Sequence, residues 1–423
     1  MTHNFPKIKE FHITPIAVVD PPLLNAAGLH APYALRTVVE LVTEDNISGI
    51  SEIPGNIAID QALEKSKPFI IGQDPFQLNS IKDVLLANFD SEDTLKRGDS
   101  PWDQRTIVHI FSAIEVACMD IIGKVTNRPI VDLLGGKRRD AVPFSAYLFY
   151  KYEGAGGKLE FGTDPAATGW AKARQASALN PDEIVAQAEA MCKEFGFKSI
   201  KLKGGAFEPR QEVDAIFALH KAFGKSTPLR FDPNALWTLE TSIKYGKEMH
   251  GVLEYLAALK KAITTPLATN MCTTSFQDLP SSFALGSEDI ILSDHHFWGG
   301  LKSSMTLADI CQTFGRDLSM HSNSHLGISL AAMVHLGAAI PNFSYALDTH
   351  YPWQSDEIIV GGRMNFEEGA VAVPSGPGLG VELDRPALEK LHQNYLRCGL
   401  TKRNDEIEMQ KMQPDWKFMK TRW

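Results

Sequence analysis

Short apolar segments alternate with longer amphipathic segments between residues 141 and 348. The short segments have strand length, and the longer ones carry apolar residues at helical spacing. The expected strands are residues 142–148, 198–203, 228–232, 252–256, 266–270, 289–293, 317–321 and 344–347. The expected helices are residues 180–195, 209–224, 238–250, 274–285, 299–315 and 325–340. This alternation predicts a (β/α)8 barrel, in which residues that follow the strands face the active site.

The chain before this region has a different pattern, which predicts an α+β fold. Strands are expected at residues 8–19, 35–42 and 49–53, and helices at residues 60–88 and 105–124. The second of these helices contains His109 and Glu115, which we expect to be packed or paired rather than catalytic.

Three further segments are expected to connect or close these parts. Residues 151–176 are rich in Gly, Ala and Thr and predict a long loop over the barrel mouth. Residues 360–384 are rich in turn-forming residues and predict a return toward the first domain, and residues 385–423 predict a helix with an extended end.

Composition excludes several classes of protein. The chain has 423 residues, 44% hydrophobic and 22% charged, which is ordinary for a two-domain soluble enzyme. The net charge of −9 and the absence of a basic cluster argue against a nucleic-acid partner. The sequence has no run of 18 apolar residues and no apolar leader in residues 1–10, so neither a membrane span nor secretion is expected. The five scattered cysteines predict reduced thiols and a cytoplasmic protein.

Two neighbouring strand ends carry residues suited to acid–base chemistry. Lys201 and Lys203 are two residues apart on one strand, so their side chains share a face. Like charges disfavour each other, so we expect one lysine to have a pKa lowered toward neutrality and to act as a base. Asp232 ends the next expected strand and offers a carboxylate to a metal ion. Together they suggest enolate chemistry; two ordinary strand ends with solvated charges are the alternative.

The other expected strand ends are also polar. The strand-end residues in chain order are Lys203, Asp232, Asn270, Asp294, His321 and Asp348. Such a set at one end of a barrel favours a catalytic site over isolated solvated charges.

Several longer motifs resemble the enolase superfamily and, within it, the glucarate dehydratases. The motifs are Asn25, His30-Ala-Pro, Gly49-Ile-Ser-Glu-Ile-Pro-Gly55, Phe197-Lys-Ser-Ile-Lys-Leu-Lys-Gly-Gly205, Asp232-Pro-Asn234, Ala268-Thr-Asn-Met271, Asp294-His-His-Phe-Trp298, His321-Ser-Asn-Ser324 and Leu347-Asp-Thr-His350. The resemblance covers nearly the whole chain. It implies an N-terminal α+β capping domain at residues 1–135, a barrel at residues 136–360 and a C-terminal segment, residues 361–423, that returns to the capping domain.

The resemblance also implies a set of catalytic roles. Lys203 would be the base on one face of the substrate, with Lys201 lowering its pKa. His321 would be the base on the other face and the acid that assists loss of the β-hydroxyl, with Asp294 orienting its ring. By the same resemblance Asn234 would stabilise the enediolate oxygen.

Metal and substrate ligands follow from the same comparison. Mg²⁺ would be held by Asp232 and Asn270. The residues that would hold the substrate hydroxyls and the distal carboxylate are Asn25, His30, Tyr147, Ser322, Asn323, Asp348 and Arg403. His295 and His296 have no metal role in the family pattern and are assigned to loop packing.

The chain departs from the family pattern after the expected strand 252–256. The family has an acidic turn with a further metal carboxylate and a helix there, whereas only nine residues separate Leu256 from Pro266. A crossover between parallel strands needs about a dozen residues or more. Glu254 is a poor substitute ligand, because the family's register would point Tyr255 toward the barrel interior, and strand alternation would then point Glu254 toward the helices. The sequence therefore predicts a barrel lacking part of its fourth unit and a metal site lacking its third ligand.

Three explanations of this gap stay open: a segment missing from the chain as given, a catalytically impaired natural variant, or a rebuilt fourth strand. The expected function is dehydration of D-glucarate, and of L-idarate, to 5-keto-4-deoxyglucarate. The alternatives are a related aldarate dehydratase or epimerase, or a non-catalytic paralogue. The expected partners are a small aldarate substrate and further copies of the chain in a homo-oligomer.

Overall fold

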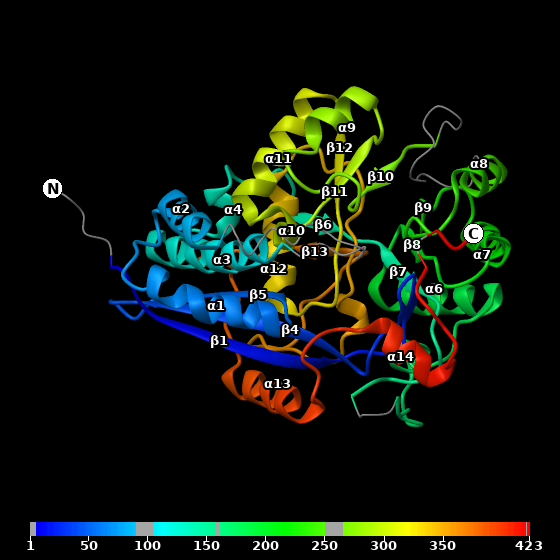
Figure 1. The fold of residues 1–423 in the computed structure, drawn as a ribbon, viewed down its shortest axis with the longest axis horizontal. Coiled ribbons are helices and arrows are strands. Elements are labelled where there is room, and N and C mark those ends of the chain that lie inside the picture. The colour runs from blue at the N-terminus through cyan, green and yellow to red at the C-terminus, as the bar shows by residue number, and fades with distance from the viewer. Residues whose placement is uncertain (1–5, 90–104, 158–160, 250–264, 420) are drawn as a thin grey trace.

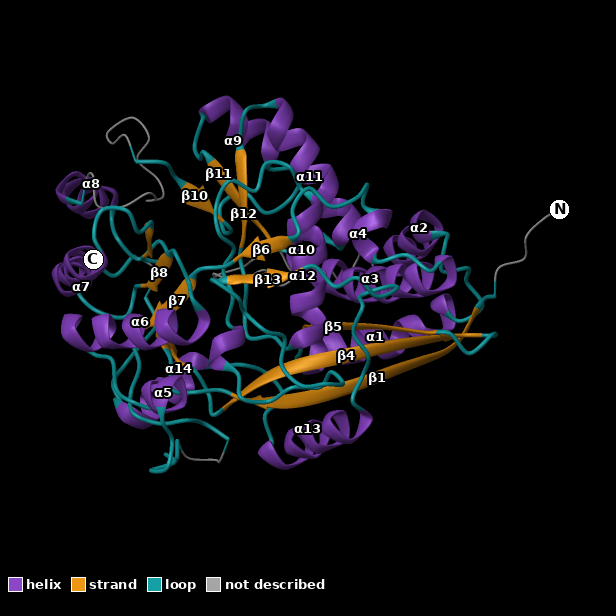
Figure 2. Ribbon diagram, turned by 180° about the vertical axis from the view of Figure 1, so that it is seen from behind, coloured by secondary structure: helices purple, strands orange, loops and turns teal. Residues whose placement is uncertain are grey.

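The computed structural model describes residues 6–89, 105–157, 161–249, 265–419 and 421–423. A three-stranded antiparallel sheet lies on one side of the molecule, and the two groups of barrel strands lie on the other (Figures 1 and 2). The expected strand 252–256, with Glu254 and Tyr255, lies outside the described residues.

The N-terminal part is a sheet between helices. Its strands, in the order β1-β4-β5, are β1 (Ile8–Val19), β4 (Tyr33–Thr43) and β5 (Ser48–Pro54). The helices that follow are α1 (Ile57–Ile70), α2 (Leu78–Phe89) and α3 (Thr106–Thr126). The C-terminal helix α13 (Arg385–Cys398) packs on β1, on the side of the sheet away from α1 and α3 (Figure 2).

The expected helix 60–88 is wrong in one respect, because it is two helices. The chain breaks at Gly72, whose φ of +89° is a left-handed conformation that glycine adopts without strain. Pro75 follows, and proline cannot donate a helical backbone hydrogen bond. The helix α3 is apolar and long enough to cross a membrane, but 89% of it is buried in the molecule, as in a core helix.

The barrel strands form two parallel groups. The first group, in sheet order, is β7 (Ala146–Phe149), β8 (Ile200–Lys203) and β9 (Leu229–Asp232). The second is β10 (Ala268–Thr269), β11 (Ile290–Ser293) and β12 (Asp317–Met320). Parallel bridges from Phe343 to Leu318 and from Leu347 to Phe144 connect the two groups. All these strands therefore run in one direction, and their carboxyl ends meet at one end of the barrel.

Helices separate the barrel strands along the chain. They are α5 (Gly169–Ala173), α6 (Pro181–Phe195), α7 (Pro209–Phe223), α8 (Leu239–Glu248), α9 (Leu279–Leu285), α10 (His295–Trp298), α11 (Leu301–Thr313) and α12 (Gly327–Ala339). The residues that flank helix α6 explain where this helix begins and ends. Asn180 accepts a hydrogen bond from the Glu183 N–H, Pro181 occupies the first turn, and Gly196 ends the helix at φ +72°.

Short elements complete the described fold. They are β2 (Leu24–Asn25), β3 (Gly28–Leu29), α4 (Ile130–Leu133), β6 (Ala141–Pro143), β13 (Ala370–Ala372), a 3₁₀ turn at Tyr351–Trp353 and α14 (Asp405–Met412). Two expected elements are corrected here. Residues 141–143 pair with β13 rather than with the barrel, and the tail contains two helices, α13 and α14.

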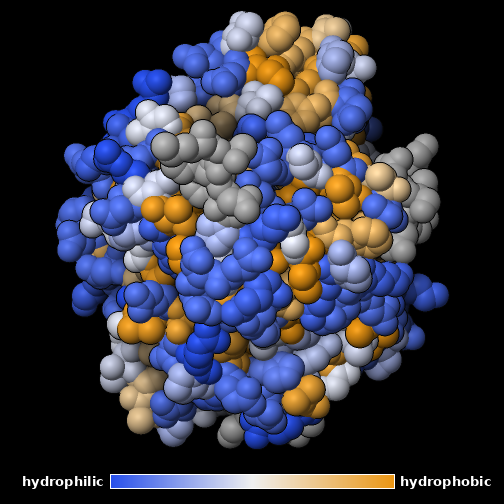
Figure 3. Space-filling view, turned by 90° about the vertical axis from the view of Figure 1, so that its left-hand side faces the viewer, coloured by the Kyte–Doolittle hydropathy of each residue, from blue (hydrophilic) through white to orange (hydrophobic). Residues whose placement is uncertain are grey.

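The surface beside the capping sheet and helices is mostly hydrophilic, with scattered hydrophobic groups (Figure 3). A denser hydrophobic area lies at the top of this view, over α9 and α11. Leu285, the last residue of α9, is 76% exposed, and Phe314, which follows the last residue of α11, is 61% exposed. The other large apolar side chains are mainly in two cores, one within the capping part and one that spans the barrel.

Candidate active site

The barrel strands place the two lysines in register with other polar and aromatic side chains. Lys201 pairs with Tyr147 on one side and Arg230 on the other, and Lys203 pairs with Asp232. Residues at these positions share one face of the sheet. The Lys201 Nζ lies 4.5 Å from the centre of the Tyr147 ring.

Lys201 is paired with carboxylates, which corrects one expectation from the sequence. Its Nζ donates to Asp348 Oδ2 at 2.6 Å and lies 3.3 Å from Asp232 Oδ2. Burial opposes the charge, but Asp348 and Asp232 outweigh burial and hold the pKa of Lys201 well above its usual value. Lys201 is therefore a fixed positive charge with its own counter-ions, not half of an uncompensated lysine pair.

Asp348 is also placed differently from the expectation. Its side chain is fully buried, with Lys201 on one oxygen and Arg230 Nη1 3.0 Å from the other. Burial would raise the pKa of Asp348, but these two cations keep that pKa below its usual value. Asp348 thus fixes two cations beneath the site, and the predicted direct contact with a substrate hydroxyl does not fit this position.

Lys203, Asp232 and Asn234 form a second group nearer the barrel mouth. The Lys203 Nζ donates to Asp232 Oδ2 at 2.9 Å and to Asn234 Oδ1 at 2.6 Å. Asn234 has a φ of +55°, a left-handed conformation that asparagine tolerates. Its Nδ2 is buried and has no hydrogen-bond partner among the described residues, so an amide donor is left for a ligand oxygen.

The predicted metal ligands Asp232 and Asn270 end β9 and follow β10. The Asp232 side chain is 23% exposed, and its pKa, which burial would raise, is held well below the usual range by Lys203 and Lys201. An ionised carboxylate and a partly buried amide oxygen suit Mg²⁺ in kind. The donor set therefore fits the ion.

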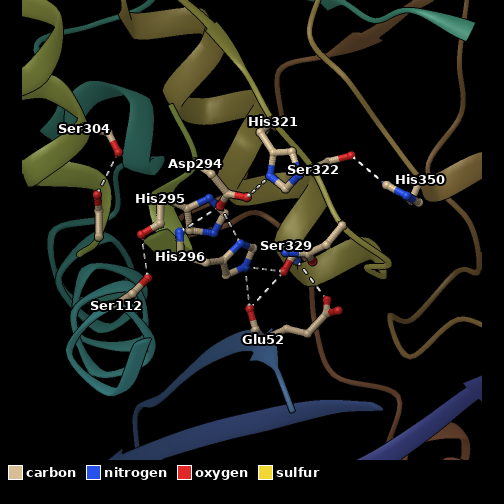
Figure 4. Close-up of polar contacts among 12 residues, drawn as sticks. Glu52, Ser112, Asp294, His295, His296, Ser304, His321, Ser322, Ser329 and His350 are labelled. Carbon is tan, nitrogen blue, oxygen red and sulfur yellow. Dashed lines mark hydrogen bonds and ion pairs between the residues drawn. The ribbon is translucent and has the colours of Figure 1, made fainter. Parts of the chain in front are cut away.

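Asp294 and His321 form the predicted pair across the second group of strands. The His321 Nδ1 lies 3.2 Å from Asp294 Oδ2, so Nδ1–H donates and Nε2 is left as the basic nitrogen (Figure 4). Asp294 also caps α10, accepting from the His296 N–H at 2.9 Å. Asp294 therefore both caps α10 and contacts the ring of His321.

His295 and His296 follow Asp294 directly in α10, and both are buried. Possible ligand atoms of the three residues lie within 4.8 Å of one another. However, the His296 Nδ1 is 2.7 Å from Asp294 Oδ1, a hydrogen-bond distance, and the two histidine rings pack together with centroids 3.9 Å apart. This geometry agrees with the packing assignment for the pair.

Three predicted substrate ligands meet in one cluster that joins the start and the end of the chain. His30 donates from Nδ1 to Asp20 at 2.7 Å and accepts at Nε2 from Arg403 at 2.7 Å. Asn25 donates to Asp405 Oδ2 at 2.7 Å, and Arg403 donates to the other oxygen at 2.6 Å. The Arg403 side chain is 42% exposed, whereas Asn25 and His30 are buried and bonded to protein groups.

The remaining predicted ligands lie between the two groups of strands. Tyr147 packs against His350, with ring centroids 4.8 Å apart, and His350 Nδ1 lies 3.1 Å from Ser322 Oγ. Asn323 accepts from Arg36 Nη1 at 2.9 Å, while its buried Nδ2 has no partner among the described residues. Asn323 is therefore placed to donate to a ligand.

Several residues of this site were not singled out from the sequence. Arg230 carried a signal, because it is two residues before Asp232 on a barrel strand and shares its face. Asp405, Glu52 and Arg36 were not assigned roles, because each also bonds to a residue far away along the chain: Asp405 to Asn25, Glu52 to Leu326 and Arg36 to Asn323.

Comparisons with known families agree with this arrangement. Residues 26–135 match the mandelate racemase / muconate lactonizing enzyme N-terminal domain, and residues 183–387 match the enolase C-terminal domain-like family. A probable glucarate dehydratase from Streptomyces coelicolor is 42% identical, over 97% of each chain. The chain belongs to the enolase superfamily.

Solved structures of superfamily members show the same fold. An enolase from Mycobacterium smegmatis, complexed with formate and acetate, is 46% identical and matches with a TM-score of 0.91 over 100% of both chains. An enolase from Pseudomonas fluorescens with bound magnesium, potassium and tartrate is 43% identical, with a TM-score of 0.92 over 99% of this chain and 100% of that chain. The fold is therefore a (β/α)8-type barrel with an N-terminal capping domain, and the chain is an acid-sugar dehydratase of this superfamily, a lyase.

The alignment with the Streptomyces relative also bears on the expected gap. It spans 434 positions, more than the 423 residues of this chain. The relative therefore has residues that this chain lacks. Their assignment to the fourth barrel unit stays a prediction, because residues 250–264 lie outside the described residues.

Proposed function

We propose that this protein dehydrates D-glucarate, and its C5 epimer L-idarate, to 5-keto-4-deoxyglucarate. The observation that carries the proposal is the hydrogen-bonded Asp294–His321 pair at the same barrel end as Lys203. The 42% identity to a probable glucarate dehydratase supports the choice of substrate. The magnesium and tartrate bound to the Pseudomonas relative support a diacid ligand and a divalent cation.

The reaction begins with removal of the proton next to a carboxylate. Lys203 and His321 act as bases on opposite faces of the substrate, so each removes the proton from one of the two configurations at the carbon next to the carboxylate. Asp232 and Asn270 would hold Mg²⁺, which would supply positive charge that stabilises the enediolate. The free amide of Asn234 is a further donor to the enediolate oxygen.

The second half of the reaction is loss of the β-hydroxyl. Protonated His321 gives its Nε2 proton to the hydroxyl, which leaves as water, and the resulting enol becomes the keto acid. Asp294 keeps Nδ1 protonated throughout, so Nε2 is the nitrogen that gains and loses the proton. At the other side of the site, Arg403 is the partly exposed cation suited to the distal carboxylate.

The test is an assay of keto-acid formation from D-glucarate, L-idarate and galactarate, with Mg²⁺ and with chelator. We expect turnover of the first two substrates only, lost with chelator. Lys203→Met and His321→Asn should each lower kcat on at least one of the two by about 10²-fold or more. Lys198→Met is the control, because Lys198 precedes the same strand but is 68% exposed and pairs with Glu368. A folded, metal-replete protein that turns over galactarate only would contradict the proposal, and one with no turnover would favour a non-catalytic paralogue.

A further inference from the structure

His296 faces hydrogen-bond acceptors at both ring nitrogens. Its Nδ1 is 2.7 Å from Asp294 Oδ1, and its Nε2 is 3.0 Å from the backbone oxygen of Glu52 (Figure 4). A backbone oxygen has no proton to donate. Asp294 is an acceptor at both oxygens, because Oδ1 also accepts from the His296 backbone N–H at 2.9 Å and Oδ2 lies 3.2 Å from His321 Nδ1.

Ser329 is the third group that contacts the His296 ring nitrogens. Its Oγ lies 3.0 Å from His296 Nε2, but it donates to the Glu52 backbone oxygen at 2.9 Å and accepts from Arg36 Nη2 at 3.1 Å. Its one proton can go either to the Glu52 oxygen or to His296 Nε2. Donation to Nε2 would leave the lone pair of that nitrogen facing the Glu52 oxygen at 3.0 Å, so the contacts favour hydrogen on both nitrogens of His296.

Another buried histidine of the same molecule provides the contrast. His335 accepts at Nδ1 from the Val131 N–H at 3.3 Å and donates from Nε2 to the Leu379 oxygen at 3.1 Å. One donor and one acceptor define a neutral ring. Burial lowers the pKa of His335 to about 4, in agreement with its contacts.

We propose that His296 is a permanently protonated positioning residue that holds Asp294 in place for His321. The inference rests on the proposed function for its catalytic meaning, but not for the protonation state itself. Asp294 Oδ1 is taken by the backbone N–H and ring of His296, so only Oδ2 is left for His321. The Asp294 carboxylate thereby pairs with two imidazole rings. The positive charge of His296 offsets part of the attraction between Asp294 and the imidazolium of His321, so Asp294 stabilises that imidazolium less.

The contacts of His296 also connect the dyad to the capping domain. Glu52 on β5 accepts from Arg36 Nε on β4 at 2.8 Å, and its carboxylate accepts from the N–H groups of Leu326 and Ser329 at the start of α12. The capping domain thus holds both His296 and the helix that follows the His321 loop.

Other titratable groups face this site. They are Arg36, Glu52, His295, His321 and His325. Burial lowers the pKa of His325 to about 3 and that of His295 well below its usual value, so both rings are neutral. Of the described histidines around this site, His296 and His321 are those whose ring nitrogens lie within hydrogen-bonding distance of the Asp294 carboxylate.

The protonation state is tested by nitrogen NMR of the protein labelled in its histidine rings. Comparison with His296→Gln and His335→Gln assigns the two signals. We expect both nitrogens of His296 to have imidazolium shifts from about pH 6 to about pH 9, while His335 shows one protonated and one bare nitrogen. A neutral His296, or a metal ion bound at its Nδ1, would overturn the proposal. This readout needs no substrate, so it survives failure of the proposed function.

The positioning role is tested by pH–rate profiles of the same variants. In His296→Gln, Asp294 no longer faces a second cation and stabilises protonated His321 more strongly. The acidic limb of the kcat profile should therefore shift to higher pH by about one unit. We expect kcat to fall about 10- to 100-fold with KM nearly unchanged, because His296 does not touch substrate. His335→Gln should leave the limb in place. A folded His296→Gln variant with an unshifted limb contradicts the role, and if that variant does not fold, the NMR result on the native protein decides.

Discussion

Charged side chains at the barrel mouth form ion pairs with their neighbours, and together they carry a net positive charge. Lys201, Lys203 and Arg230 face two carboxylates, Asp232 and Asp348, through contacts between 2.6 and 3.3 Å. Three cations against two anions leave one positive charge in excess. Before any metal is bound, this group already favours the approach of an anionic acid sugar.

Asp348 is the buried counter-ion shared by Lys201 and Arg230. Replacing it in Asp348→Asn leaves Lys201 and Arg230 buried without their shared counter-ion. In urea denaturation of whichever form unfolds cooperatively, the chain as given or one with the segment expected after Leu256 restored, we expect the free energy of unfolding to fall by about 3–5 kcal/mol. Asp132→Asn is the control, because Asp132 forms an exposed pair with Arg128 and should cost less than about 1 kcal/mol. Equal losses in the two variants would show that Asp348 is not a buried counter-ion.

At the scale of elements, helix α11 is fixed to the capping domain by a carboxylate from α3. Glu115 is buried and accepts from the N–H groups of Leu301 at 3.0 Å and Lys302 at 2.9 Å, in the first turn of α11. Burial raises the pKa of Glu115 from 4.5 to about 7 despite these donors. The sequence predicted a packed or paired residue here, and the structure shows both.

This raised pKa makes stability depend on pH. Between about pH 4.5 and 7 the folded protein keeps the proton of Glu115 and the unfolded chain has lost it, so stability falls as pH rises. Glu115→Gln should remove up to about 3 kcal/mol of this fall, measured by urea denaturation at about pH 5 and pH 8. A variant whose pH dependence matches that of the native protein would contradict this assignment.

Local pattern predicted most of the elements. The periodic segments gave α6, α7 and α12 within two residues of their observed ends. The pairings across the molecule could not be predicted in this way. His296 and Glu52 are 244 residues apart, and Lys201 and Asp348 are 147 apart, so no local spacing signals either contact. The strand-end rule found these residues, Asp232 and Asp348 among them, but it could not show which of them form ion pairs with one another.

At the scale of the whole molecule, the site is shared by the barrel, the capping sheet and the C-terminal segment. Arg36 and Glu52 lie on the sheet, Arg403 and Asp405 lie in the C-terminal segment, and the strand ends carry the groups proposed to be catalytic. Closing this assembly depends on a complete barrel, so the gap expected between Leu256 and Pro266 affects folding as well as metal binding.

The expected gap leads to a prediction about the chain as given. A missing helix leaves apolar strand surface uncovered, at a cost on the order of 10 kcal/mol, comparable to the stability of a domain. We expect this chain to melt without cooperativity, and a form with an acidic turn and helix restored after Leu256 to melt cooperatively and bind Mg²⁺. Calorimetry on both forms measures this. A cooperative melt and tight Mg²⁺ binding by the short form would show a rebuilt fourth strand.

The central claim is that Lys203 and His321 act on opposite faces of one substrate. Proton NMR in D₂O tests it by following loss of the C5 proton from D-glucarate and from L-idarate with Mg²⁺, on whichever form melts cooperatively. We expect Lys203→Met to lose this reaction with one epimer and His321→Asn to lose it with the other. If both variants lose the same epimer, or either keeps both, the two residues do not flank the substrate and the proposed mechanism is wrong.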